Sequence, residues 1–250
     1  MNEVSGLLLT RPLKEAVPSV LFIPGNMCCP TVFDDITVPA GVQASTIDWA
    51  MSPGPWDIEA LGERVTKLVV EQKLGPTILC GYSAGGVIAM LAAISLGSRV
   101  SGLLISNTGA NTHGHGDPNF PQNILDQWGT PELNEPFLFR VFARPIPPKL
   151  QAETEAYYKT LNREAVYQAA YSLRQIDISS QLSQLQCAVT IAHGVLDTSR
   201  TPQHANQLRQ LIPGAKLVWL DGGHTIMIEN RVGWQKELDE LIGKTINKAD

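Results

Sequence analysis

The chain has 250 residues with a formal net charge of −5, and 44% of its residues are hydrophobic. This composition is too apolar for a disordered chain, and its acidic balance disfavours a nucleic-acid partner, because such binding needs a basic surface. The sequence has no run of about 18 apolar residues, so no membrane span or membrane partner is expected.

Short apolar runs alternate with longer amphipathic segments along the first part of the chain. Residues 19–23 (SVLFI) form an uninterrupted apolar run, as expected for a strand that is buried on both faces. Apolar residues in 57–74 recur every three or four positions, which indicates a helix that Gly75-Pro76 ends. This alternation predicts βαβ units around a parallel sheet. The predicted strands are 19–23, 42–48, 77–80 and 100–106, and the predicted helices are 57–74 and 84–96.

Residues 109–180 interrupt this rhythm. They contain weak helical patterns at 132–142 and 149–174 and no convincing strand. The alternation then resumes, with strands predicted at 188–193 and 215–220 and helices at 202–211 and 232–246. A long insertion between core strands is usually functional. We therefore predict an α/β core (1–108 and 181–250), with a mostly parallel sheet flanked by helices, and a helical lid (109–180) inserted before strand 188–193.

The pentapeptide Gly81-Tyr82-Ser83-Ala84-Gly85 fits the pattern G-x-S-x-G between a predicted strand and a predicted helix. A turn this tight strains the serine backbone, and only small residues two positions before and after it avoid collision. The turn holds the serine oxygen at a helix N-terminus, where free N–H groups stabilise negative charge. The alternative is a glycine-rich turn without chemistry, but strand, turn and helix together favour a nucleophile at Ser83.

A serine hydroxyl needs a base, and the base needs an acid that orients it. In this architecture the expected chain order is serine, acid, histidine. Asp197 follows the predicted strand 188–193, and His224 follows the predicted strand 215–220. Asp221 is a rival acid, although it lies only three residues before His224. Of the other histidines, His193 is expected to be structural, His204 is expected in a surface helix, and His113 and His115 belong to the insertion.

An oxyanion requires two hydrogen-bond donors. The first is expected from the backbone N–H of Ala84, the residue after the nucleophile. The second is expected from the loop after strand 19–23, where Asn26 is the first choice and Met27 the reserve. The alternative for this loop is a plain turn, because Pro-Gly and Gly-Asn both form turns.

Together these motifs resemble those of the α/β-hydrolase superfamily, and the likeness extends from about residue 19 to residue 241. It is closest to small members such as carboxylesterases and enol-lactonase-like enzymes. The segments GYSAGG, GVLDTSRTP and GGHTIMIEN look like the nucleophile, acid and histidine segments of that family. The resemblance implies the catalytic residues Ser83, Asp197 and His224 and an oxyanion hole of Asn26 and Ala84. Because few residues precede strand 19–23, the family's N-terminal hairpin is expected to be short or partly missing.

Aromatic residues of the predicted lid offer a wall for a mostly apolar substrate pocket, whereas packing of the lid on the core is the expected role of any single one. Arg140 and Arg144 are each expected on the surface, with binding of a substrate carboxylate as the alternative. A metal site at His113 and His115 would need a third ligand that the sequence does not offer, so no metal is expected. The candidate pocket residues are Met27, Tyr82, Trp128, Phe139 and Arg140.

These observations predict a cofactor-free serine hydrolase that cleaves a small, largely apolar ester through an acyl-enzyme. A lactone, an amide, a carbamate or a carbon–carbon bond remains an alternative substrate, because the same residues serve all of them. A small-molecule receptor is the non-enzyme alternative. The expected partner is a small-molecule substrate, the protein being a monomer or a homodimer. Because no secretion signal is recognisable and the four cysteines are expected to be reduced thiols, a cytoplasmic location is expected.

Overall fold

The computed structural model describes residues 2–246. For Asn2 and Phe139 it describes the backbone but not the side chain. Within these residues one sheet of eight strands has the order β1-β2-β4-β3-β5-β6-β7-β8. Strands β3 to β8 run parallel, whereas β1 and β2 form an antiparallel hairpin against β4. The strands are Asn2–Val4 (β1), Leu7–Leu9 (β2), Ser19–Ile23 (β3), Gln43–Asp48 (β4), Thr77–Tyr82 (β5), Val100–Ser106 (β6), Ala188–Gly194 (β7) and Lys216–Leu220 (β8).

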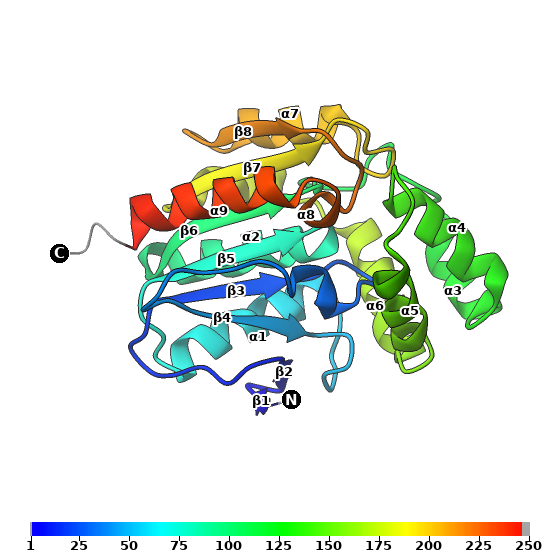
Figure 1. Ribbon diagram of the computed structural model, residues 1–250, viewed down its shortest axis with the longest axis horizontal. Coiled ribbons are helices and arrows are strands. Elements are labelled where there is room, and N and C mark those ends of the chain that lie inside the picture. Colours follow the sequence, from blue (N-terminus) through cyan, green and yellow to red (C-terminus); the bar gives the residue numbers. More distant parts are fainter. Residues whose placement is uncertain (1, 247–250) are drawn as a thin grey trace.

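Helices cover both faces of the sheet (Figure 1). On one face lie α1 (Ile58–Glu71), α2 (Ala84–Leu96) and α7 (Pro202–Leu211), and on the other lies α9 (Arg231–Thr245). Successive residues of β5 point to opposite faces, so Leu79 packs with the α1–α2 cluster and Ile78 with the α9 cluster. Both side chains are fully buried, which explains why the central strands are continuous apolar runs.

Between β6 and β7 the chain forms four α-helices in the part that the structure describes. These are α3 (Phe120–Gln127), α4 (Pro131–Val141), α5 (Pro148–Tyr158) and α6 (Arg163–Gln175). They lie beyond the carboxyl ends of the parallel strands (Figure 1). The predicted helical insertion before the strand 188–193 is therefore confirmed, while its limits at 109 and 180 stay a prediction. We call α3–α6 the insertion helices.

The structure differs from the sequence prediction in local detail. The predicted segment 149–174 is two helices, because the Asn162 side chain accepts the Glu164 N–H and begins a new helix at Arg163. Helix α3 was not predicted, since it has only eight residues and begins with Phe120-Pro121. The N-terminal hairpin is present but short, with three residues in each strand.

Hydrogen bonds fix the insertion helices to the core. The Tyr157 hydroxyl of α5 donates to a carboxylate oxygen of Asp48 at 2.6 Å. The Asn26 amide donates to the carbonyl of Val166 on α6 at 3.0 Å. The insertion is therefore joined directly to the loop after β3 and to the last residue of β4. In the described part of the chain, no helix has the length and apolar character that crossing a bilayer requires.

Candidate active site

Ser83 occupies the sharp turn between β5 and α2. Its backbone has φ +54° and ψ −120°, a conformation that a non-glycine residue rarely adopts. A Cβ on Gly81 would lie 2.4 Å from the Gly85 carbonyl oxygen, and one on Gly85 would lie 2.0 Å from the Ile23 oxygen. Both flanking positions therefore exclude any side chain, which is the physical reason for glycine at each.

The turn places Ser83 beside the residues predicted as base and acid. His224 Nε2 lies 3.0 Å from Ser83 Oγ, and His224 Nδ1 lies 2.8 Å from Asp197 Oδ2. Asp197 follows β7, and His224 follows β8, so neighbouring parallel strands deliver both side chains to the same edge of the sheet. The sequence order serine, acid, histidine thus becomes a continuous hydrogen-bonded chain.

Asp197 is buried but well supplied with donors. Its Oδ1 accepts the backbone N–H groups of Ser199 at 2.7 Å and Arg200 at 2.9 Å. Burial by itself would raise the pKa of Asp197, but the charge and hydrogen bond of His224, with the Arg200 N–H and the Asn107 amide, lower it to about 2. The carboxylate is therefore ionised at neutral pH and favours an imidazolium on His224.

Asn107 is a supporting residue that the sequence analysis missed. Its side-chain amide donates to Asp197 Oδ2 at 2.7 Å and to the carbonyl of Gly223 at 3.2 Å. It therefore joins the acid to the loop that carries the histidine. Asn107 directly follows β6 and has φ +49°, a left-handed conformation that asparagine tolerates better than most residues. The only signal in the sequence was its place at the end of a strand.

The rival residues have other partners. Asp221 forms an exposed ion pair with Arg144 at 2.8 Å. His193 is fully buried, its Nε2 bonds to the Arg200 carbonyl at 2.8 Å, and burial lowers its pKa to about 4, so it is neutral. His204 was expected on a surface helix, but its side chain is buried, and its Nδ1 lies 3.1 Å from the Thr201 hydroxyl.

Two backbone N–H groups beside Ser83 are free in the described structure. Neither Ala84 N nor Asn26 N has a hydrogen-bond partner among residues 2–246, and both residues line the cavity at Ser83. The N–H of Met27, the reserve candidate, is occupied by the Asn26 side-chain oxygen at 3.0 Å. The geometry therefore favours Asn26 over Met27 as the second donor to an oxyanion.

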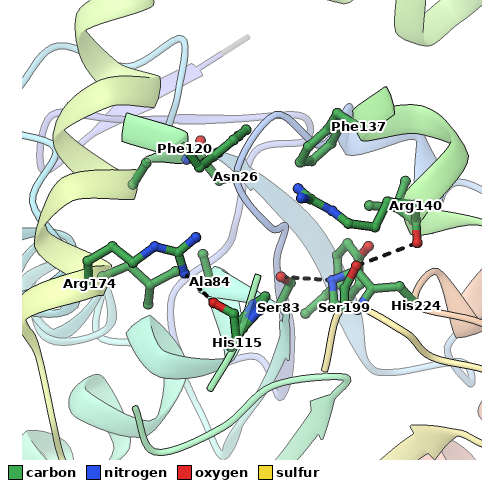
Figure 2. A pocket seen from close by; sticks show the side chains of 14 residues that line it. Asn26, Ser83, Ala84, His115, Phe120, Phe137, Arg140, Arg174, Ser199 and His224 are labelled. Atoms are coloured by element: carbon green, nitrogen blue, oxygen red, sulfur yellow. Dashed lines mark hydrogen bonds between the residues drawn. The ribbon is translucent and has the colours of Figure 1, made fainter. Parts of the chain in front are cut away.

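A cavity opens above Ser83, between the sheet edge and the insertion helices (Figure 2). Tyr82 and Arg140, both predicted, line it. Met27 lies behind it, in a smaller neighbouring cavity that also contacts Tyr82. Trp128 does not line this cavity. It is the residue that follows α3, and its side chain packs against the core. The side chain of Phe139 lies outside the described part of the structure.

Several residues of the cavity were not predicted as site residues. Phe120 and Phe137 form an aromatic wall, their rings stacked with centroids 5.9 Å apart. Leu173 and Arg174 enter from α6, and His115 enters from the loop before α3. Helix α3 and the orientation of α6 bring them in, and neither was readable from periodicity. In the described residues, no three histidine, cysteine or acidic side chains gather as metal ligands would.

Comparison with known proteins identifies the family. Residues 20–233 match the model of the family described as "Alpha/beta hydrolase family". The chain therefore belongs to the alpha/beta hydrolase family, and the resemblance and fold class inferred from sequence are confirmed.

Individual relatives are distant. Over 256 aligned residues the chain is 27% identical to the polyketide synthase ThaQ of Burkholderia thailandensis, covering 93% of this chain and 12% of that protein. Among solved structures, the enol-lactonase of Burkholderia xenovorans LB400 aligns with a TM-score of 0.84 at 20% identity, covering 96% of this chain and 98% of that one. An esterase of Exiguobacterium antarcticum aligns with the same score and identity, covering 96% and 97%. At these identities the structural likeness establishes the fold.

Proposed function

We propose that this chain is a serine hydrolase that cleaves a small ester through an acyl-enzyme. The observation that carries the proposal is the continuous chain Ser83 Oγ, His224, Asp197, with separations of 3.0 and 2.8 Å, at the base of a cavity. Distances of this size allow proton transfer without rearrangement. The esterase among the structural neighbours is consistent with this chemistry.

In the proposed first step, Ser83 Oγ attacks the ester carbonyl and its proton passes to His224 Nε2. Ionised Asp197 stabilises the imidazolium and holds its ring by the bond to Nδ1. The carbonyl oxygen becomes an anion that the N–H groups of Ala84 and Asn26 stabilise. His224 then gives its proton to the departing alcohol, leaving an acyl group on Ser83.

In the second step, His224 removes a proton from water, which attacks the acyl-enzyme. The same two N–H groups stabilise the second tetrahedral anion, which collapses to release the acid while His224 returns its proton to Ser83 Oγ. The free space in the cavity is about 60 Å³, room for a few water molecules. Short acyl groups are therefore the best fit, against a wall that Phe120 and Phe137 make apolar.

A lactone is the second candidate substrate. A cyclic ester is opened by the same attack and the same proton transfers, and an enol-lactonase is among the structural neighbours. Acyclic esters and lactones differ in whether the alcohol leaves or stays attached to the acyl group, so a direct comparison of turnover separates them.

The test is hydrolysis of p-nitrophenyl esters from acetate to octanoate, with γ- and δ-lactones in parallel, by the wild type and Ser83→Ala. We expect many turnovers by the wild type, fastest with short chains, and loss of at least about a thousandfold in kcat for Ser83→Ala. Equal activity in the variant would refute the role of Ser83. Turnover that stops after one equivalent would instead favour a receptor.

A further inference from the structure

Two arginines from different insertion helices enter the cavity above Ser83. Arg140 comes from α4 and Arg174 from α6, and their guanidinium groups point into the cavity from opposite sides (Figure 2). The Arg140 guanidinium packs on Phe120 and Phe137, at 5.5 and 5.4 Å from the ring centres. Arg174 donates to the backbone carbonyls of His115 at 3.3 Å and Asp117 at 2.7 Å. Both groups are therefore held in fixed positions.

Neither arginine has an acidic partner in the described part of the chain. No carboxylate there lies within 4.0 Å of either guanidinium, and the Nε atom of each is buried without a hydrogen-bond partner. Arg144 and Arg231, which are on the surface, do form ion pairs, with Asp221 and Asp35. Arg140 and Arg174 are therefore half-buried cations without a carboxylate within ion-pair distance in the described residues.

The charged groups nearest the two cavity arginines include other cations, which repel them. Burial and the Arg140 charge lower the pKa of Arg174, and burial and Arg174 lower the pKa of the fully buried Arg200 to about 9. The charge of Asp117 opposes these shifts, but its carboxylate lies outside ion-pair distance of both cavity arginines, so an anion between the two guanidinium groups would offset their burial and mutual repulsion. His115, which also faces the cavity, has its pKa lowered to about 2 by burial and by the charges of Arg200 and Arg174, so it adds no charge at neutral pH.

We propose that the substrate carries a carboxylate, which Arg140 and Arg174 bind while the ester carbonyl reaches Ser83. This inference rests on the proposed hydrolase function and refines its substrate from a largely apolar ester to an anionic one with an apolar stem. A carboxylate fits because planar guanidinium groups bind its two oxygens in fixed geometry. The small cavity also favours a compact anion, and the aromatic wall suits the methylene groups between carboxylate and ester.

The decisive experiment compares two esters that differ only at the far end of the acyl chain. The p-nitrophenyl monoester of glutaric acid ends in a carboxylate, and p-nitrophenyl pentanoate ends in a methyl group. Charge-assisted hydrogen bonds contribute enough for a preference of about tenfold or more, so we expect the wild type to favour the glutarate ester in kcat/KM by at least that factor. The matched pair 4-acetoxybenzoate and its methyl ester tests a carboxylate on the leaving group instead.

Arg140→Gln and Arg174→Gln test the two arginines. Each variant is expected to lower the preference ratio by about tenfold or more, because each removes one charge-assisted contact. Arg163→Gln is the matched control, since Arg163 is exposed at the start of the same helix as Arg174. It removes an equal charge and is expected to keep the ratio of the wild type.

Binding without turnover is measured by the thermal shift of the inactive Ser83→Ala protein with glutarate, with pentanoate and with inorganic phosphate. Glutarate is expected to raise Tm most, and the rise is expected to vanish when Arg140→Gln is added.

A ratio of kcat/KM values near one in the wild type for both ester pairs, with hydrolysis still dependent on Ser83, would overturn this inference and leave the proposed function standing. Absence of hydrolysis of any ester would overturn the proposed function, and the thermal shift would then decide the anion site alone. A larger shift with phosphate than with glutarate would overturn the assignment of the carboxylate.

Discussion

Asn107 offers the sharpest test of how the candidate site is held together. Its amide joins Asp197 Oδ2 at 2.7 Å to the carbonyl of Gly223 at 3.2 Å, one residue before His224. In Asn107→Gly both bonds are lost, while the backbone keeps free access to φ +49°. The variant therefore isolates the amide from the backbone conformation.

The expected magnitude follows from the two contacts. A bond to a buried carboxylate contributes about 1.5–3 kcal/mol, and the longer bond to a carbonyl contributes about 0.5–1.5 kcal/mol. We expect Asn107→Gly to lower the free energy of unfolding by about 2–4 kcal/mol. Asn107→Ala loses the same bonds and in addition strains a left-handed residue, at a cost of about 1 kcal/mol more.

Urea unfolding measures both variants, alone and in an Asp197→Ala background. The contact with Asp197 predicts that the effect of Asn107→Gly shrinks by about 1.5–3 kcal/mol when the carboxylate is absent. A loss below about 0.5 kcal/mol, or the same loss in both backgrounds, would refute this reasoning.

Three further outcomes are expected. The folded state holds His193 neutral, with a pKa of about 4 that lies below the unfolded value near 6.5. Its contribution to the free energy of unfolding is therefore full above pH 6.5 and falls by up to about 3 kcal/mol as the pH drops to 4. Urea unfolding of His193→Gln should show a shallower pH dependence than that of the wild type. Gly85→Ala, whose Cβ would lie 2.0 Å from a backbone oxygen, is expected to lower the free energy of unfolding by about 3 kcal/mol or more or to fail to fold. Gly243→Ala in α9, with no atom within 4 Å of its Cβ, is expected to raise the free energy of unfolding by about 0.5–1 kcal/mol. Equal Tm values for the two variants would contradict this. Tyr157→Phe removes the 2.6 Å hydrogen bond to buried Asp48 and is expected to lower the free energy of thermal unfolding by about 1.5–3 kcal/mol. Tyr158→Phe is the control and should cost less, because the Tyr158 hydroxyl has no hydrogen-bond partner in the described structure.

The core and the Ser83–His224–Asp197 geometry were predictable because each depends on a strong local pattern. Continuous apolar runs fix the parallel strands, and the ends of β5, β7 and β8 meet at one edge of the sheet. Two glycines that exclude any side chain mark the turn at Ser83. The position of Asp221, only three residues before His224, favoured Asp197 as the acid, and the structure places Asp221 in a surface ion pair.

The cavity wall was less predictable, because it depends on packing between distant segments. The Arg140 side chain packs between rings from α3 and α4, and α3 was not evident in the sequence. Trp128 and Phe120 belong to the same short helix region, yet only Phe120 reaches the cavity. Aromatic content predicted an apolar wall, whereas the unpaired charges of Arg140 and Arg174 required three-dimensional contacts to recognise.

The most direct test that Ser83 is the nucleophile is covalent labelling of the intact protein with a fluorophosphonate, followed by mass spectrometry and peptide mapping. We expect one adduct per chain on Ser83 and none in Ser83→Ala. Labelling of His224→Gln should be much slower, because the base that activates the serine oxygen is missing. Labelling at another residue, or undiminished labelling of Ser83→Ala, would contradict it.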